Sequence, residues 1–234
     1  MATFVVTHGA WSAGWAWKKI RERLSARGHT VFTPTHTGLG ERHHLAGPDI
    51  DLDLHIQDIV NVLEFEDLND VILVGHSYGG MVATGVADRV AERIKTIVYV
   101  DAHVPRDGDS VFSLNPDRRE NMKDLIDSGG WEMPPSQSPD DTSEEDLAWT
   151  KPRRKPQPVK TFDQPIKLQN GEPKMPRTYV YCKRIRPGDV FRKYLERAKE
   201  EGWGIYEIDS SHSPNVTQPD LLTDVLDEIA GKLG

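Results

Sequence analysis

The chain has 234 residues, 37% of them hydrophobic and 28% charged, a balance typical of one globular domain rather than a disordered chain. Its formal net charge of −8 argues against nucleic acid or an anionic membrane as the main partner. The one cysteine, Cys182, can form no disulfide within the chain, and its apolar sequence neighbours predict a buried, inert thiol. The absence of a signal-peptide pattern and of a long apolar run favours a cytoplasmic protein.

Short β-rich runs alternate with helical patterns through the first hundred residues. Strands are expected at 3–7, 29–34, 71–75 and 95–100. The helices between and after them are expected at 17–28, 52–65 and 79–90. Apolar strands that alternate with amphipathic helices predict an α/β protein, with a parallel sheet and helices on both of its faces.

The alternation fails between residues 104 and 176, where proline and charged residues predominate. Within this stretch, residues 115–129 and 143–150 each have the composition of a short helix. The alternation then resumes with strands at 177–182 and 203–208 and helices within 188–202 and 220–233. We therefore expect one core, formed by residues 1–103 and 177–234, with residues 104–176 inserted as a cap.

The turn between the third expected strand and the helix after it reads Gly75-His76-Ser77-Tyr78-Gly79, a G-x-S-x-G pattern. A serine at the tip of such a turn has a strained backbone, and its hydroxyl projects beyond the end of the sheet. The N–H of the following residue lies at the helix start, where it can stabilise an oxyanion. In this context the pattern favours Ser77 as a nucleophile over a chance match in a glycine-rich loop.

Four stretches spread over nearly the whole chain carry a resemblance to a known family: FVVTHGAWSAGWAW, GHSYGG, YVDAHVP and SSHSPNVTQPD. They resemble the α/β-hydrolase superfamily and, more narrowly, its small esterase and hydroxynitrile lyase group, which includes plant methyl esterases and related bacterial hydrolases. The resemblance implies a six-stranded, mainly parallel sheet with a cap inserted after the fourth strand. It also implies an oxyanion hole formed by the N–H groups of Ala10 and Tyr78, and it requires neither a cofactor nor a metal.

A serine nucleophile needs a general base, and His212 is the preferred candidate. It lies in a loop after the last strand and before the last helix, where the chain order of the family places the base. A metal site formed by His36, His43, His44 and Glu41 is the alternative. That loop has no defined ligand spacing such as H-E-x-x-H, so the metal site is disfavoured.

The acid that orients the base has two candidates. Most family members take it from the loop after the next-to-last strand, where Lys183 and Arg184 stand here. The first acid afterwards is Asp189, whose position fits the N-cap of the next helix. Asp101 ends the strand after the nucleophile helix, at the carboxyl edge where catalytic loops gather. Asp101 is therefore preferred, and Asp189 remains the alternative.

The cap and the loop after the first strand are expected to wall the substrate pocket. The candidate lining residues are aromatic or imidazole side chains: Trp11, Tyr78, His103, Phe112, Trp131, Trp149 and Phe162. Any lone aromatic side chain could instead pack between the cap and the sheet, which is its commoner fate. An aromatic-rich cleft suits a small apolar or aromatic ester, and the same groups could cleave a carbamate, lactone or amide.

Two other classes of protein compete with a hydrolase. Hydroxynitrile lyases of this group place a threonine where Gly9 stands and a lysine where Ser213 stands, so a lyase is disfavoured. A non-catalytic ligand-binding protein on the same fold is the second alternative, and the presence of both Ser77 and His212 argues against it. The expected partner is a small-molecule ester, with no nucleic acid and no membrane. The oligomeric state stays open, a homodimer being one option.

Overall fold

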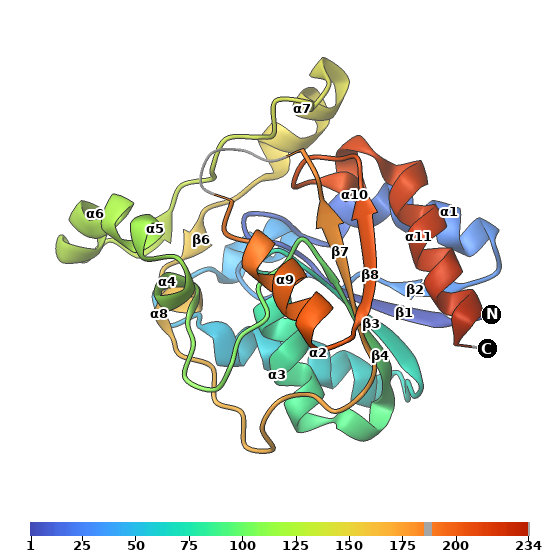
Figure 1. Cartoon of the computed structure of the whole chain (residues 1–234). Helices are drawn as coiled ribbons and strands as arrows, with labels where there is room; N and C mark the ends of the chain where they lie inside the picture. Colours follow the sequence, from blue (N-terminus) through green and yellow to red (C-terminus); the bar gives the residue numbers. More distant parts are fainter. Residues whose placement is uncertain (185–188, 234) are drawn as a thin grey trace.

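The computed structural model describes residues 1–184 and 189–233 and contains a six-stranded sheet in which every pair of neighbouring strands is parallel (Figure 1). The strands are β1 (Thr3–Thr7), β2 (Thr30–Phe32), β3 (Val71–His76), β4 (Ile94–Val100), β7 (Arg177–Cys182) and β8 (Gly204–Ile208). Their order in the sheet is β2-β1-β3-β4-β7-β8. The predicted α/β class and mainly parallel six-stranded sheet are confirmed.

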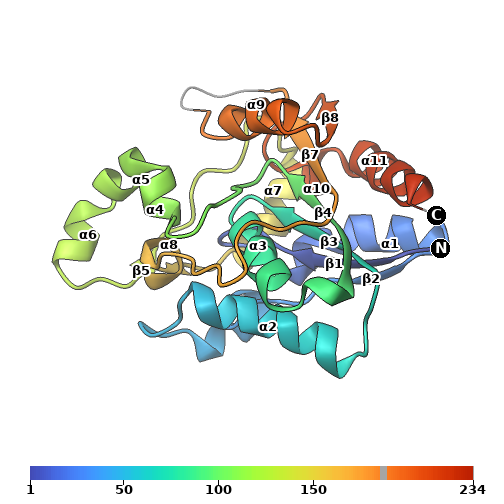
Figure 2. The same cartoon turned by 60° about the horizontal axis from the view of Figure 1, so that its bottom comes forward.

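Helices cover both faces of this sheet (Figure 2). On one face lie α1 (Lys18–Ala26) and α11 (Pro219–Lys232). On the other lie α2 (Leu52–Phe65), α3 (Gly79–Arg89) and α9 (Arg192–Glu200). The expected helices are present, although α9 is shorter than its pattern. Gly188, at the start of that pattern, lies outside the described residues.

The sheet separates two hydrophobic cores. Ile72 and Val74 of β3 pack with α1 and α11, whereas Leu73 packs with the helices on the opposite face. Because successive side chains of a strand point to opposite faces, a central strand buried on both sides is apolar throughout. This explains the continuous apolar run that marks β3 in the sequence.

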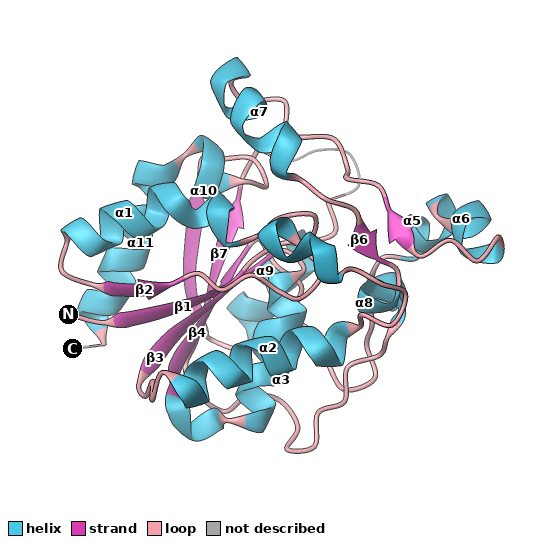
Figure 3. Cartoon of the chain, turned by 180° about the vertical axis from the view of Figure 1, so that it is seen from behind, coloured by secondary structure: helices cyan, strands magenta, loops and turns pink. Residues whose placement is uncertain are grey.

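Residues 104–176, called the inserted segment from here on, connect β4 to β7. They contain α4 (Val111–Leu114), α5 (Pro116–Asn121), α6 (Lys123–Asp127), β5 (Glu132–Met133), α7 (Glu144–Thr150), β6 (Gln157–Pro158) and α8 (Lys160–Asp163). The stretch 115–129, expected as one helix, is divided into α5 and α6. Figure 3 shows β6 and α8 on the side of the molecule opposite the chain termini.

The loop after β8 leads into the one-turn helix α10 (Pro214–Thr217), which the sequence patterns did not predict. Pro214 occupies its first turn, where the missing N–H of proline has no intrahelical partner to lose. No helix in the part of the chain that the structure describes is long and apolar enough to cross a membrane.

Candidate active site

Ser77 lies at the tip of the turn between β3 and α3, with a φ of 54°. For a residue other than glycine this left-handed conformation costs about 1–2 kcal/mol. Two neighbouring segments support it. The Ser77 N–H donates to the carbonyl of Val100 at 3.3 Å, and the Ser77 carbonyl accepts from the N–H of His103 at 3.1 Å. The strained turn is therefore held by the end of β4 and the residues after it.

Two glycines after the turn allow α3 to approach other backbone closely. A Cβ atom on Gly79 would lie 2.0 Å from the carbonyl oxygen of Thr7, and one on Gly80 would lie 2.0 Å from that of His103. Neither distance is tolerable for a larger residue. The glycines thus place the start of α3, and Ser77 with it, between the ends of β1 and β4.

The structure brings Ser77, His212 and Asp101 together. His212 Nε2 lies 2.8 Å from Ser77 Oγ, and His212 Nδ1 lies 2.7 Å from Asp101 Oδ2. The carboxylate accepts the Nδ1–H, which leaves Nε2 free to accept the hydroxyl proton of Ser77. A serine in this arrangement can act as a nucleophile toward a carbonyl carbon.

Asp101 is fixed by the backbone around it. It has a φ of 42°, its side chain is buried, and its N–H donates to the carbonyl of Val180 at 2.8 Å. Its Oδ1 accepts the N–H of Cys182 at 3.3 Å. One carboxylate oxygen therefore bonds to the β7 backbone while the other faces His212.

Asp189, the alternative acid, has different partners. Its Oδ2 accepts the hydroxyl of Tyr181 at 2.6 Å, and its Oδ1 accepts the N–H groups of Phe191 and Arg192 at 2.9 and 3.2 Å. These bonds satisfy N–H groups at the start of α9, which is the capping role that its sequence position indicates. The structure thus places Asp101, and not Asp189, against His212.

His76 holds the backbone of His212. Its Nε2–H donates to the carbonyl oxygen of His212 at 2.7 Å. Burial, followed by the nearby charge of His212, lowers the pKa of His76 to about 3, so its ring is neutral at neutral pH. A Cβ atom on Gly9 would lie 2.9 Å from His76 Nδ1 and 3.2 Å from Ser77 Cβ. Because Gly9 has no side chain, nothing at position 9 pushes against the ring of His76 or the side chain of Ser77.

The N–H groups of Ala10 and Tyr78 are available to an oxyanion. Both residues line the cavity beside Ser77, and within the described ranges neither N–H donates to another protein group. Tyr78 precedes α3, whose N-terminus favours negative charge. Its hydroxyl donates to Nδ1 of His55 at 2.9 Å, and His55 in turn donates from Nε2 to the carbonyl of Thr37 at 2.9 Å.

The loop after β1 is tied to the inserted segment through Trp11. Trp11 has a φ of 57°, and its backbone N–H donates to Oε1 of the buried Gln157 at 3.0 Å. Its indole N–H donates to the carbonyl of Met133 at 3.0 Å. Gln157 is held by its own amide, which donates to Oγ1 of Thr161 at 2.8 Å. The conformation of the residue next to Ala10 thus depends on β5 and β6.

The histidines of the metal alternative lie apart. His36 is buried between the rings of His8 and His55, at centroid distances of 4.0 and 4.8 Å, whereas His44 is exposed. Burial lowers the pKa of both His8 and His55 to about 4, so these rings are neutral at neutral pH. Among the residues that the structure describes, no group of three or more His, Cys, Asp or Glu side chains could hold a metal ion.

A cavity of about 370 Å³ opens at Ser77 and is roofed by the inserted segment. This volume lies within the range of small-molecule sites. The expected residues Trp11, Tyr78, His103 and Phe162 line it. Cys182 also reaches the wall, and burial raises the pKa of its thiol well above the ordinary value, so the thiol stays protonated.

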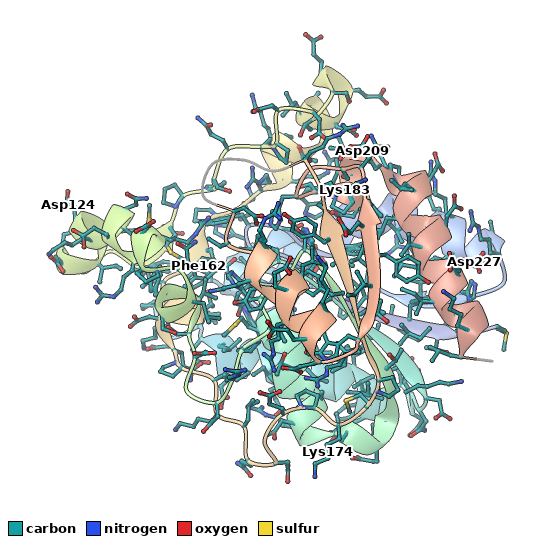
Figure 4. The ribbon with its side chains drawn as sticks, viewed as in Figure 1. Asp124, Phe162, Lys174, Lys183, Asp209 and Asp227 are labelled. Carbon is teal, nitrogen blue, oxygen red and sulfur yellow. The ribbon has the colours of Figure 1, made fainter. Side chains whose placement is uncertain are left out.

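Three of the expected lining residues lie elsewhere. Phe112 is buried edge-on against Phe162, with ring centroids 5.7 Å apart, and Trp149 packs edge-on against Trp15 at 5.3 Å. Trp131 is half-buried beside the short β5–β6 sheet, where its carbonyl accepts the N–H of Val159. All three pack within or beneath the inserted segment. Phe162 belongs to the hydrophobic core, and Figure 4 labels it where the inserted segment adjoins the rest of the molecule.

Sequence patterns missed Phe191, Arg118 and Gln157. The ring of Phe191 stacks on that of His212, with centroids 4.8 Å apart and 12° between the planes. Arg118 lines the cavity from α5, and Gln157 holds the loop after β1. None of the three belongs to a recognisable motif, because each acquires its role from contacts between segments that are distant in the chain.

Comparison with known proteins gives a family and several relatives. The model described as the alpha/beta hydrolase family matches residues 4–225. The chain is 36% identical over 246 residues to a carbendazim-hydrolysing esterase of Nocardioides sp. (strain SG-4G), covering 100% of this chain and 98% of that protein. It is 23% identical over 260 residues to methylesterase 17 of Arabidopsis thaliana, covering 99% and 92%.

The structure is also similar to that of an extracellular alpha/beta-hydrolase from a Paenibacillus species. The TM-score is 0.82 at 25% sequence identity, and the match covers 97% of this chain and 98% of the other. That hydrolase is described as sharing structural and functional homology with tobacco salicylic acid binding protein 2. The likeness therefore extends over the inserted segment as well as the sheet.

Proposed function

Because the chain belongs to the alpha/beta hydrolase family and is a hydrolase of the carboxylesterase type, we propose that it cleaves a small ester through an acyl-enzyme on Ser77. The observation that carries this proposal is the pair of hydrogen bonds that link Ser77 Oγ to His212 and His212 to Asp101, at 2.8 and 2.7 Å. These three groups act as nucleophile, base and orienting acid. The ester has an apolar or aromatic part, because Trp11, Trp15, Tyr78, Phe162 and Phe191 are among the residues that line the cavity.

In the acylation step, Ser77 Oγ attacks the ester carbonyl carbon while Nε2 of His212 takes the hydroxyl proton. The positive charge on the imidazolium is balanced by Asp101, which accepts its Nδ1–H. The carbonyl oxygen becomes an oxyanion and accepts the N–H groups of Ala10 and Tyr78. His212 then returns the proton to the alkoxide of the departing alcohol, and the acyl group remains on Ser77.

In the deacylation step, water takes the place of the alcohol. His212 removes a proton from the water as it attacks the acyl carbon, and the same two N–H groups hold the second oxyanion. The proton then passes from His212 to Ser77 Oγ as the ester bond to the enzyme breaks. The products are the carboxylic acid and the free enzyme, and the inserted segment acts in both steps as a cap over the cavity.

Gln157 supports the oxyanion hole, and its replacement tests this part of the proposal. Gln157→Leu removes the acceptor for the Trp11 N–H while nearly keeping the side-chain volume. We expect kcat to fall roughly tenfold, because the loop that carries the Ala10 N–H loses its fixed position. The free energy of unfolding should fall by about 1–3 kcal/mol, because a buried N–H is left without a partner. Steady-state kinetics and urea unfolding measure the two effects.

Gln164→Leu is the matched control. Gln164 also reaches from the inserted segment to the core, where its Oε1 accepts the N–H of Asp53 at 2.9 Å. Among the described residues no hydrogen bond joins it to the loop after β1, so its loss should reduce stability and leave kcat near that of the native enzyme. If both variants lose stability and neither loses kcat, Gln157 has only a structural role.

A carbamate is the second candidate for the scissile group. The relative at 36% identity is named for the hydrolysis of carbendazim, which is a methyl carbamate attached to a benzimidazole ring. The same attack by Ser77 on a carbamate carbonyl would release methanol and leave a carbamoyl-enzyme. A cavity of about 370 Å³ is large enough for such a bicyclic compound.

Position 9 supports a hydrolase over a hydroxynitrile lyase. The lyases of the related group place a threonine where this chain has Gly9. Here any Cβ atom at that position would lie 2.9 Å from His76 Nδ1, so a threonine would displace the ring that holds the His212 backbone. The proposed reaction needs no cofactor and no metal.

We also propose a cytoplasmic location, since the one cysteine is buried and forms no disulfide.

The decisive experiment measures turnover and covalent labelling together. We expect p-nitrophenyl acetate to give a burst of p-nitrophenol equal to the enzyme concentration, followed by steady turnover. A fluorophosphonate should stop the reaction and add its mass to the peptide that contains Ser77. Carbendazim in a parallel assay distinguishes carbamate from ester specificity.

Two results would contradict the proposal. Absence of both turnover and labelling would favour a ligand-binding protein on this fold. Loss of activity on treatment with a chelator would instead revive a metal-dependent reaction.

A further inference from the structure

The side chain of Arg118 lines the cavity, and among the described residues its guanidinium forms no ion pair. It lies on α5 of the inserted segment and is half-buried. Its guanidinium lies over the rings of Trp11 and Phe162, 5.2 and 5.9 Å from their centroids. Throughout residues 1–184 and 189–233, no carboxylate, hydroxyl or carbonyl oxygen accepts a hydrogen bond from this guanidinium. The backbone N–H of Arg118 donates to the carbonyl oxygen and Oδ1 of Asn115.

The other arginines that line the cavity are already engaged. Arg184 forms ion pairs with Asp141 and Asp209 at 3.2 and 3.0 Å. Arg154 donates to the carbonyl and hydroxyl oxygens of Ser136 at 2.7 and 3.3 Å. Among the described lining residues, Arg118 is therefore the arginine whose donors remain open.

The two acidic residues that line the cavity, Asp101 and Asp189, also have hydrogen-bond partners of their own. Asp101 bonds to His212 and Cys182, and Asp189 bonds to Tyr181 and the start of α9. Neither faces Arg118 as a partner. Among the described residues that line the cavity, Arg118 thus has no carboxylate partner, although the whole chain carries a net charge of −8.

A guanidinium in this setting is suited to one kind of ligand group. It has five N–H donors in a planar fork, which match the two oxygens of a carboxylate. The two aromatic rings hold the plane of the guanidinium and reduce its freedom before a ligand binds. Partial burial lowers the pKa of Arg118, yet an arginine stays protonated, so an incoming anion would relieve an unfavourable burial of charge.

We propose that Arg118 binds a carboxylate carried by the substrate at a distance from the scissile ester, so that the preferred substrates are esters that bear a free acid. This inference rests on the proposed esterase function. The reacting carbonyl lies at Ser77, and the acid end of the substrate lies toward α5 of the inserted segment. Arg118 is then a specificity residue that contacts the substrate and takes no part in proton transfer.

Two pairs of synthetic esters test the inference. The first pair places the acid on the leaving alcohol: p-acetoxybenzoate against its uncharged isostere, p-acetoxybenzamide. The second places it on the acyl side: monomethyl terephthalate against methyl p-carbamoylbenzoate. For each pair the measured quantity is the ratio of kcat/KM for the acid to kcat/KM for the amide. A substitution that lowers activity toward both members of a pair equally leaves this ratio unchanged.

We expect the native enzyme to prefer the acid in at least one pair by roughly ten- to a hundredfold, the strength of a hydrogen bond to a charged group. Arg118→Gln should bring that ratio close to one, and Arg118→Lys should restore part of it, because it keeps the charge but loses the planar fork. Arg119→Gln is the matched control. It removes the same charge from the exposed neighbour on α5 and should leave the ratio as in the native enzyme.

The outcomes separate this inference from the proposed function. Two results would overturn the role of Arg118 and leave the esterase function intact. In the first, all four esters are turned over without a preference for either acid. In the second, the preference for the acid survives Arg118→Gln. The role of Arg118 would also be overturned if the acid-to-amide ratio of kcat/KM fell equally in Arg118→Gln and Arg119→Gln. The effect would then reflect the overall charge of the protein. Failure to turn over any ester would count against the proposed function itself.

Discussion

Replacing Ser77 by alanine is expected to lower kcat roughly a millionfold, because the acyl-enzyme route disappears and only binding and the oxyanion hole remain. The backbone of residue 77 should keep its conformation, since the bonds that support it are made by its own N–H and carbonyl. The measurement is p-nitrophenyl acetate turnover, together with loss of fluorophosphonate labelling. Ser25→Ala, on the exposed side of α1 and purified in the same way, sets the limit for contaminating activity. Labelling that persists in Ser77→Ala would place the nucleophile elsewhere.

Replacing Asp101 by asparagine is expected to lower kcat by roughly 10⁴-fold. An amide in place of the carboxylate presents an N–H to Nδ1 or a weaker acceptor, so His212 loses both its correct tautomer and the balancing charge. The side chain keeps nearly the same shape, and its contact with the Cys182 N–H survives if the amide oxygen faces β7. Circular dichroism should therefore show a folded protein, and the loss should appear in kcat.

Asp189→Asn is the matched comparison for Asp101→Asn. Its carboxylate bonds to Tyr181 and to N–H groups at the start of α9, so the substitution should cost about 1 kcal/mol of stability or less and lower kcat only slightly. The opposite ranking of the two variants would assign the orienting acid to Asp189.

The sheet could be predicted from the sequence because its signals are local. The apolar run of β3 and the helical spacing of α2 are each contained in a few residues, and the structure has α2 over the same residues as its pattern. The turn at Ser77 is equally local, since strand, glycines and helix follow one another directly. Such features depend on neighbours in the chain, which the sequence displays.

The cavity wall could be predicted only in part. Trp11 and His103 follow strands β1 and β4 closely, so the end of the sheet fixes where they lie. Phe112 and Trp149 belong to the inserted segment, and which way an aromatic side chain there faces depends on how several short helices pack together. Arg118 carries no signal in the sequence, because the lack of an ion-pair partner among the described residues is recognisable only in the folded structure.

The choice between the two acids shows the same limit. Both follow a strand of the parallel sheet, so both lie at its carboxyl edge, and sequence position alone left Asp189 as an alternative. The structure distinguishes them through Tyr181 and the start of α9, which engage both oxygens of Asp189. A single oxygen of Asp101 is bonded to the backbone, and the other is available to His212.

The two hydrogen bonds from Trp11 to the inserted segment have a consequence for the proposed oxyanion donor Ala10. Gln157 and Met133 accept these bonds, and both belong to the short sheet β5–β6. A movement that carried this sheet away from β1 would break both bonds and release the loop that holds the Ala10 N–H. In the proposed mechanism, such a movement would displace one of the two oxyanion donors, so acyl transfer would require the β5–β6 sheet to be in contact with the loop after β1.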